Sequence, residues 1–143
     1  MNKIVIIIPS RLNARRLPNK PLKLINNKEM ILHVYDSAAR SSAGEVYVAT
    51  PDQKIVDIVK NFGGNAIKTS DNHETGTDRI FEVFKETLNS EPNIIINLQG
   101  DMPNLEPQAI SNLVSYMNKN KCDIGTLASD FSSKIEIDNP NIV

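Results

Sequence analysis

Residues 4–22 read IVIIIPSRLNARRLPNKPL, an apolar run that passes directly into a cationic loop. The run Ile4–Ile8 is entirely β-branched and does not alternate with polar residues, which predicts a strand buried on both faces, as in a parallel sheet. The loop carries four cationic side chains, Arg11, Arg15, Arg16 and Lys20. Prolines stiffen this loop and exclude regular helix from it. Because guanidinium and ammonium groups suit phosphate oxygens, the stretch predicts a phosphate-binding loop, with a solvated basic loop as the alternative.

The rest of the chain alternates between helical and strand patterns. Apolar residues at helical spacing predict four helices, at residues 29–42, 53–62, 77–88 and 106–119. Short apolar runs predict five strands, at residues 3–9, 46–50, 65–69, 93–98 and 122–128. This alternation predicts the α/β class, with a mostly parallel sheet flanked by helices. In the doubly wound order 3-2-1-4-5, the first and fourth strands are neighbours, and ligands bind beyond their carboxyl ends.

Composition narrows the class of protein. A length of 143 residues matches one domain. The net charge of -1 argues against a nucleic-acid or membrane partner, because neither Lys nor Arg is in excess. Cys122 is the single cysteine, which excludes a disulfide framework and a cysteine-based metal site. No apolar stretch has the length of a membrane span and the N-terminus does not resemble a signal peptide, so we expect a cytoplasmic protein.

A second motif, Gln99-Gly100-Asp101, follows the fourth predicted strand. A carboxylate at this position is a good ligand for Mg²⁺, which binds through one or two carboxylates together with substrate phosphates. Gln99 offers a donor and an acceptor that can read a base or a sugar edge. The alternative is a plain turn, in which Gly-Asp is common. Because the motif lies opposite a cationic loop, it favours a site that binds a nucleoside triphosphate together with a metal ion.

A third motif, Gly76-Thr77-Asp78-Arg79, opens a predicted helix. Thr77 or Asp78 is a candidate helix cap. An arginine is unfavourable at a helix N-terminus, which makes Arg79 a candidate ligand-facing residue, with a solvated first-turn residue as the alternative. His73 precedes the motif and is a candidate acid/base group, but we expect it to be an inert, exposed loop residue without a partner.

These three motifs together resemble the 3-deoxy-manno-octulosonate cytidylyltransferase family, also called CMP-Kdo synthetase. The resemblance covers essentially the whole chain and rests on residues 8–11, 16–22, 76–79 and 97–103. It implies a Rossmann-like nucleotidyltransferase fold and transfer of CMP from CTP to the acid sugar Kdo, with release of pyrophosphate, for lipopolysaccharide synthesis. It also implies Mg²⁺ as cofactor and a homodimer.

The resemblance assigns roles by position. Arg11 and Lys20 would hold the triphosphate with help from Arg16, and Asp101 would bind Mg²⁺; Arg11, Lys20 and Asp101 are thus the expected catalytic residues. The expected substrate-binding residues are Pro9 and Ser10 beside the cytosine, Arg16, and Arg79 and Gln99 in the nucleotide and sugar pocket. Two positions depart from the family pattern: Ala14 replaces a common serine, and Met102 replaces a common glutamate.

Members of the family continue well beyond the length of this chain. We therefore expect residues 1–143 to be the nucleotide-binding part of a single, C-terminally truncated cytidylyltransferase domain, without the acceptor-sugar and dimer part. Three alternatives remain open from the sequence. They are a cytidylyltransferase for another acidic sugar of the sialic-acid type, a non-catalytic CTP-binding fragment, and an α/β domain whose loop is merely basic.

Overall fold

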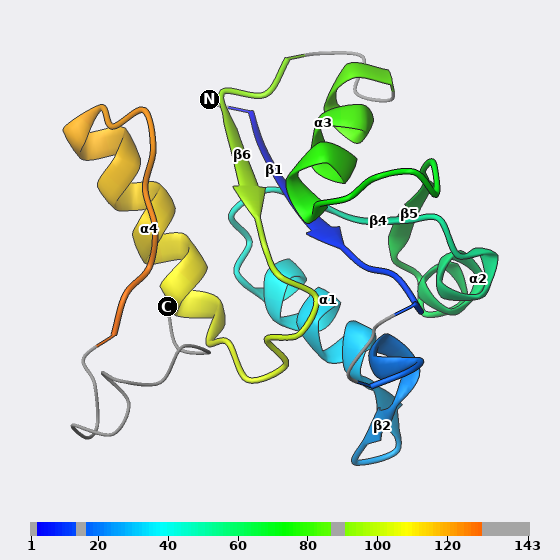
Figure 1. Cartoon of the computed structure of the whole chain (residues 1–143). Coiled ribbons are helices and arrows are strands. Elements are labelled where there is room, and N and C mark those ends of the chain that lie inside the picture. The colour runs from blue at the N-terminus through cyan, green and yellow to red at the C-terminus, as the bar shows by residue number, and fades with distance from the viewer. Residues whose placement is uncertain (1–2, 14–16, 87–90, 130–143) are drawn as a thin grey trace, which may run out of the picture.

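A parallel sheet forms the centre of the computed structural model, which describes residues 3–13, 17–86 and 91–129 (Figure 1). Its four strands are β1 (Ile4–Pro9), β4 (Glu45–Thr50), β5 (Asn65–Lys68) and β6 (Ile94–Asn97). They are ordered β5-β4-β1-β6, and all three pairings are parallel. The predicted neighbourhood of the first and fourth strands is therefore confirmed, and the loops after β1 and β6 leave the sheet side by side.

Helices cover both faces of this sheet, as the uninterrupted β-branched run predicts. They are α1 (Met30–Arg40), α2 (Gln53–Asn61), α3 (Gly76–Glu86) and α4 (Pro107–Asn120). On one face, Ile6 and Ile8 pack with residues of α1, α2 and α4; on the other, Val5 and Ile7 pack with Ile80 and Val83 of α3. All four of these β1 side chains are fully buried. Burial on both faces is what excludes polar residues from this strand.

Between β1 and α1 the chain forms a short 3-10 turn and a small hairpin. The turn is η1 (Lys20–Leu22), and the hairpin pairs β2 (Leu24–Ile25) with β3 (Lys28–Glu29) in antiparallel fashion. Asn26 and Asn27 connect the two strands with φ angles of 49° and 62°. Asparagine tolerates this left-handed region better than most residues, so the Asn-Asn pair allows the tight turn.

The prediction of a strand at residues 122–128 is wrong. Residues 122–129 form no strand, and among the described residues β6 is an edge of the sheet. The segment packs on α4 instead: a Cβ placed on Gly125 would lie 3.1 Å from Sδ of Met117. A strand needs a partner edge for its backbone groups, and a groove of about 540 Å³ separates this segment from β6. The sequence also predicts one helical turn within residues 130–139 and the start of a strand at residues 142–143, and both lie outside the described residues.

The described helices are too short or too polar to cross a bilayer. The longest of them, α4, has 14 residues, against the roughly 20 that a membrane span requires.

Candidate functional site

The chain that leaves β1 is anchored by its neighbours. The backbone N–H of Ser10 donates to the carbonyl of Ala49 at 2.9 Å, and that of Leu12 donates to Oδ2 of Asp52 at 2.8 Å. Asp52 occupies the N-cap position of α2, but its side chain makes no cap hydrogen bond to that helix. Sequence reasoning missed this use of Asp52, because an aspartate before a helix is ordinarily a cap. The Asp52 carboxylate thus fixes the start of the cationic loop.

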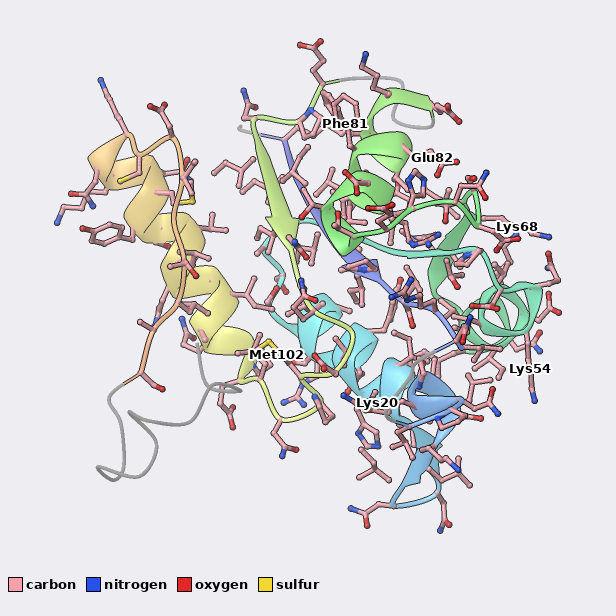
Figure 2. All side chains as sticks on the ribbon, in the orientation of Figure 1. Lys20, Lys54, Lys68, Phe81, Glu82 and Met102 are labelled. Atoms are coloured by element: carbon pink, nitrogen blue, oxygen red, sulfur yellow. The ribbon has the colours of Figure 1, made fainter. Side chains whose placement is uncertain are left out.

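Lys20 and Asp101 meet although they are 81 residues apart. Nζ of Lys20 donates to Oδ2 of Asp101 at 2.8 Å, and the two side chains are 38% and 54% exposed. Figure 2 shows Lys20, the first residue of η1, and Met102, the sequence neighbour of Asp101 on the loop after β6. So exposed an ion pair contributes at most about 1 kcal/mol to stability. Both groups can therefore exchange this contact for another partner at little cost: an anion for Lys20, a cation for Asp101.

Two motif glycines let the three motif segments approach each other at Pro9. A Cβ on Gly100 would lie 3.0 Å from the carbonyl oxygen of Pro9, and a Cβ on Gly76 would lie 3.1 Å from Cγ of Pro9. Both distances are shorter than ordinary contacts. The glycines thus allow the loop after β6 and the start of α3 to pack on the end of β1.

A cavity of about 170 Å³ opens at this meeting point. It is lined by Pro9, Ser10, Arg11, His73, Glu74, Thr75, Gly76, Arg79 and Gln99. Oγ of Ser10 is buried and, within the described parts of the chain, is the one buried side-chain polar atom without a hydrogen-bond partner. Leaving such a group unpaired costs about 1–3 kcal/mol, so a polar ligand that pairs with it gains affinity. The cavity is smaller than the roughly 300–1,000 Å³ of a pocket for a drug-sized ligand, and it suits part of one, such as a single base.

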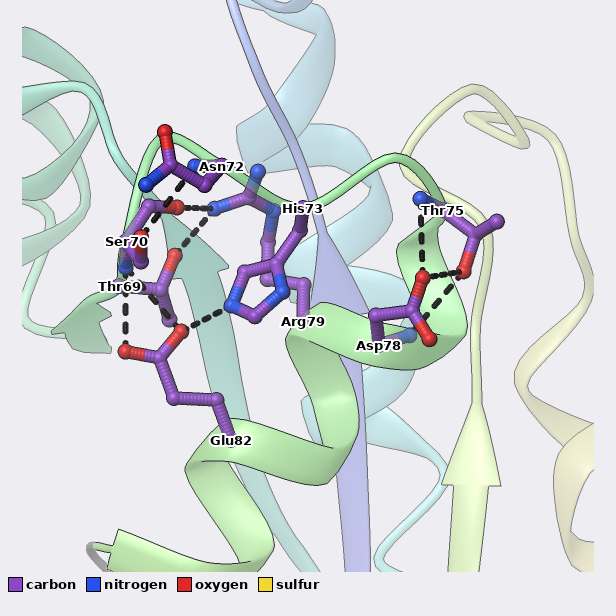
Figure 3. Close-up of polar contacts among 8 residues, drawn as sticks. All are labelled: Thr69, Ser70, Asn72, His73, Thr75, Asp78, Arg79 and Glu82. Carbon is purple, nitrogen blue, oxygen red and sulfur yellow. Dashed lines mark hydrogen bonds and ion pairs between the residues drawn. The ribbon is translucent and has the colours of Figure 1, made fainter.

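Arg79 lines this cavity and also forms hydrogen bonds that hold the neighbouring chain in place. Its side chain is only 3% exposed, and Nη1 donates to Oγ1 of Thr69 and, at 2.9 Å, to the carbonyl of Ser70 (Figure 3). Burial lowers the pKa of Arg79, Glu82 opposes this shift, and the nearby charge of Arg11 adds to it. Arginine nevertheless remains protonated at neutral pH. Two guanidinium groups that repel one another at a cavity favour an anionic ligand.

The segment before α3 is tied to the helix by reciprocal contacts. Asp78 N–H donates to Oγ1 of Thr75 at 3.1 Å, and Oδ2 of Asp78 accepts from Thr75 N–H at 3.2 Å (Figure 3). This is a capping box, so Thr75 caps the helix with the help of Asp78. Thr77 and Asp78 are the two caps that the sequence predicts for α3, and Asp78 takes part in the capping box through its side chain. The capping box fixes the direction in which the chain enters α3.

The expectation that His73 is exposed and unpartnered is wrong. Its side chain is 20% exposed, and Nε2 contacts Oε2 of Glu82. Both oxygens of the same carboxylate accept from Ser70 N–H at 3.1 Å. Sequence reasoning missed Glu82 altogether. The available signal was spacing, because a residue three positions after Arg79 lies on the same side of a helix.

The lowered pKa of Glu82 predicts that acid reduces the contribution of this carboxylate to stability. Burial raises this pKa, but the hydrogen bonds from His73 and Ser70 and the charges of His73 and Arg79 outweigh burial and lower it below 4.5. The carboxylate therefore contributes stability that is complete above pH 4.5 and is lost as the pH falls through the native pKa.

We expect Glu82→Gln to lower the free energy of unfolding more at pH 7 than in the acidic range where Glu82 is protonated. Urea unfolding at both pH values measures the difference. An equal loss of stability at both would contradict the assignment.

The other candidate residues fall into three groups. Gln99 lines the cavity, and its Nε2 donates to Oδ1 of Asn97 at 2.9 Å. Lys20 and Asp101 pair beside the cavity without lining it. Arg16 lies outside the described residues, as do Ala14 and Arg15.

The larger groove between β6 and α4 does not suit a phosphate ligand. Among the described residues its lining is mostly aliphatic, and Asp123 is the one charged residue of that lining. A triphosphate requires cationic partners, which the described lining of this groove does not supply. The smaller cavity, with Arg11 and Arg79, therefore remains the candidate site.

Comparison with known proteins shows which family this chain resembles in sequence. The chain is 42% identical over 145 residues to the 3-deoxy-manno-octulosonate cytidylyltransferase of Thermodesulfovibrio yellowstonii and 39% identical to that of Glaesserella parasuis. The two alignments cover 97% and 96% of this chain, but only 57% and 54% of those proteins. The chain thus spans little more than half the length of these relatives.

Solved structures agree on the fold. A CMP:2-keto-3-deoxy-manno-octonic acid synthetase complexed with CTP superposes with a TM-score of 0.78 at 44% identity, over 83% of this chain and 48% of that one. A cytidylyltransferase from Leptospira borgpetersenii shares the fold, with a TM-score of 0.71 at 24% identity, over 85% of this chain and 51% of its own. The family model for cytidylyltransferases matches residues 5–143. The fold is thus that of a nucleotidyltransferase, and the chain belongs to the cytidylyltransferase family.

Proposed function

We propose that this chain binds CTP and supplies the nucleotide-binding part of a CMP-Kdo synthetase, which transfers CMP from CTP to Kdo and releases pyrophosphate. The observation that carries the proposal is the cavity where the three motifs meet. It is lined by the guanidinium groups of Arg11 and Arg79 and by the hydroxyl of Ser10, which has no partner among the described residues. The relatives named above support Kdo over a sialic-acid-type acceptor. Because the chain spans 57% of the first of these relatives, a CTP-binding chain without turnover is the second candidate.

The proposed roles follow from charge and position. Pro9 and Ser10 place backbone and a hydroxyl beside the base, while Arg79 and Gln99 line the same cavity. Arg11, which lines the cavity, and Lys20, which pairs with Asp101, would hold the triphosphate with the assistance of Arg16. Two cations near the transferred phosphoryl group neutralise charge that develops as the Kdo hydroxyl attacks the α-phosphorus and pyrophosphate leaves.

Asp101 is the residue that would hold Mg²⁺. Within the described ranges no three histidine, cysteine or acidic side chains are grouped as a preformed metal cage. A single carboxylate nevertheless fits this ion, because Mg²⁺ keeps several waters and completes its shell with substrate phosphates. Bound there, Mg²⁺ would supply Lewis-acid stabilisation of the phosphate oxygens. Lys20 would then exchange its contact with Asp101 for one with the triphosphate.

The proposal extends to the setting of the reaction. We place the enzyme in the cytoplasm, where CTP is available, and we expect a homodimer from the resemblance to the family. The net charge of -1 gives no support to a nucleic-acid or membrane partner.

Two assays on the chain test the proposal. Titration calorimetry with CTP, UTP and ATP in the presence of Mg²⁺ should show tightest binding of CTP. A pyrophosphate-release assay with CTP and Kdo then separates an active enzyme from a CTP-binding chain without turnover. Absence of CTP binding would contradict both candidates.

Lys20→Ala should weaken CTP binding about tenfold, because one charge-assisted hydrogen bond to the triphosphate is lost. Binding of cytidine, which has no phosphate, should not change. Lys28→Ala is a matched control. Nζ of Lys28 lies 3.6 Å from Oδ2 of Asp36 in a similar surface pair, which does not line the cavity. Equal CTP affinities of the Lys20 and Lys28 variants would argue against a triphosphate role for the loop.

A further inference from the structure

Glu82 holds both ends of a short stretch of the cavity wall. It lies on α3 with its side chain 18% exposed. Its carboxylate accepts from the backbone N–H of Ser70 and contacts Nε2 of His73, so one side chain fixes residues 70–73 at their first and last positions (Figure 3). Arg79, one turn earlier on α3, binds Thr69 and the carbonyl of Ser70. The stretch is thus held by two side chains from a single helix.

The contact with Glu82 also determines where the proton of His73 resides. An ionised carboxylate only accepts hydrogen bonds, so Nε2 of His73 must carry the hydrogen in this pair. In the neutral ring Nδ1 is then an acceptor. His33 is in a comparable state for a different reason, because its Nε2 contacts the carbonyl oxygen of Ile25 at 2.8 Å. The chain has two histidines, and both are therefore expected as Nε2–H tautomers.

His73 lines the candidate cavity together with Ser10 and Arg79. Its orientation and tautomer therefore affect which polar groups a ligand meets there. We propose that Glu82 is a positioning residue of the nucleotide cavity, which acts through His73 by fixing residues 70–73 and keeping the imidazole in the Nε2–H form. This inference rests on the proposed binding of CTP.

Glu82→Gln tests the inference, because it keeps the shape of the side chain but presents an NH₂ group to one of the two donors. Imidazole nitrogen shifts, measured by NMR at about pH 8 where histidine is ordinarily neutral, report the tautomer. We expect the His73 signals of the variant to move toward the Nδ1–H form, while those of His33 stay as they are. CTP affinity should fall about tenfold, because a cavity wall that is no longer held at residues 70–73 would lose about one hydrogen bond to the ligand.

Two further variants keep the result interpretable. Glu86→Gln, at an exposed position one turn further along α3, should leave both the His73 tautomer and CTP affinity unchanged. If Glu82→Gln fails to fold, His73→Gln replaces it, because that variant leaves the contact between Glu82 and Ser70 in place. It too should weaken CTP binding about tenfold, again the equivalent of one hydrogen bond to a charged group.

An unchanged His73 tautomer in folded Glu82→Gln would overturn the inference, as would normal CTP affinity in either variant. In both cases CTP binding by the unmodified chain would leave the proposed function standing. If the unmodified chain itself does not bind CTP, the proposed function fails, and the nucleotide role of Glu82 fails with it.

Discussion

Arg79→Met is expected to abolish measurable CTP binding and to lower the free energy of unfolding by about 3 kcal/mol. The change keeps much of the side-chain volume but removes a nearly buried charge. It leaves Oγ1 of Thr69 and the carbonyl of Ser70 without their donor. It also removes one of the two guanidinium groups at the cavity. Calorimetric titration with CTP and urea unfolding measure the two effects.

A matched variant separates this effect from a general loss of charge. Arg40→Met removes an exposed guanidinium at the end of α1 and should change neither quantity appreciably. Arg79→Lys serves if the methionine variant does not fold, because it keeps the positive charge but loses the planar fork of donors. CTP affinity within twofold of the unmodified chain, in either folded Arg79 variant, would show that Arg79 serves the fold alone.

Asp101→Asn should remove the dependence of CTP binding on Mg²⁺. In the unmodified chain, we expect CTP affinity to rise at least tenfold when Mg²⁺ is added, since Asp101 would hold the ion and the ion would offset the negative charge of the phosphates. Without Mg²⁺ the variant should bind CTP at least as well as the unmodified chain, because a negative charge near the triphosphate is gone and Lys20 is released. The variant should therefore bind CTP more weakly than the unmodified chain when Mg²⁺ is present, and at least as tightly when it is absent. Titrations with and without EDTA measure both affinities.

Asp36→Asn is the control for this experiment. Asp36 pairs with Lys28 on the surface, as Asp101 pairs with Lys20, but it lies away from the cavity. Its variant should keep the full response to Mg²⁺. A normal Mg²⁺ response in Asp101→Asn would remove Asp101 from the metal role and leave its pair with Lys20 as a surface contact.

The sequence predicted the centre of the fold well for a physical reason. A strand with helices on both faces must be apolar at every position, so Ile4–Ile8 reveal both the burial and the parallel sheet. Once β1 and β6 are neighbours, the loops that carry Lys20 and Asp101 must leave the sheet on the same side. Segments far apart in the chain were therefore brought together by topology.

The errors arose where tertiary context overrides local pattern. Residues 122–128 have the composition of a strand but pack on α4 instead of pairing with β6. Composition indicates apolar surface but does not indicate whether the segment lies close enough to the edge of β6 to pair with it. His73 and Glu82 are polar residues nine positions apart, and neither helical nor strand periodicity predicts their contact. Asp52 has the position of a helix cap and binds the neighbouring loop.

The proposed roles of Ser10, Arg79 and Gln99 require that the base of CTP enter the cavity between β1 and α3. Backbone amide NMR of the chain during titration with CTP and Mg²⁺ tests this claim directly. We predict the largest shift changes at Ser10, Thr75 and Gly76, with little change along residues 123–127 of the apolar groove. Changes concentrated at residues 123–127, with Ser10 unaffected, would contradict it.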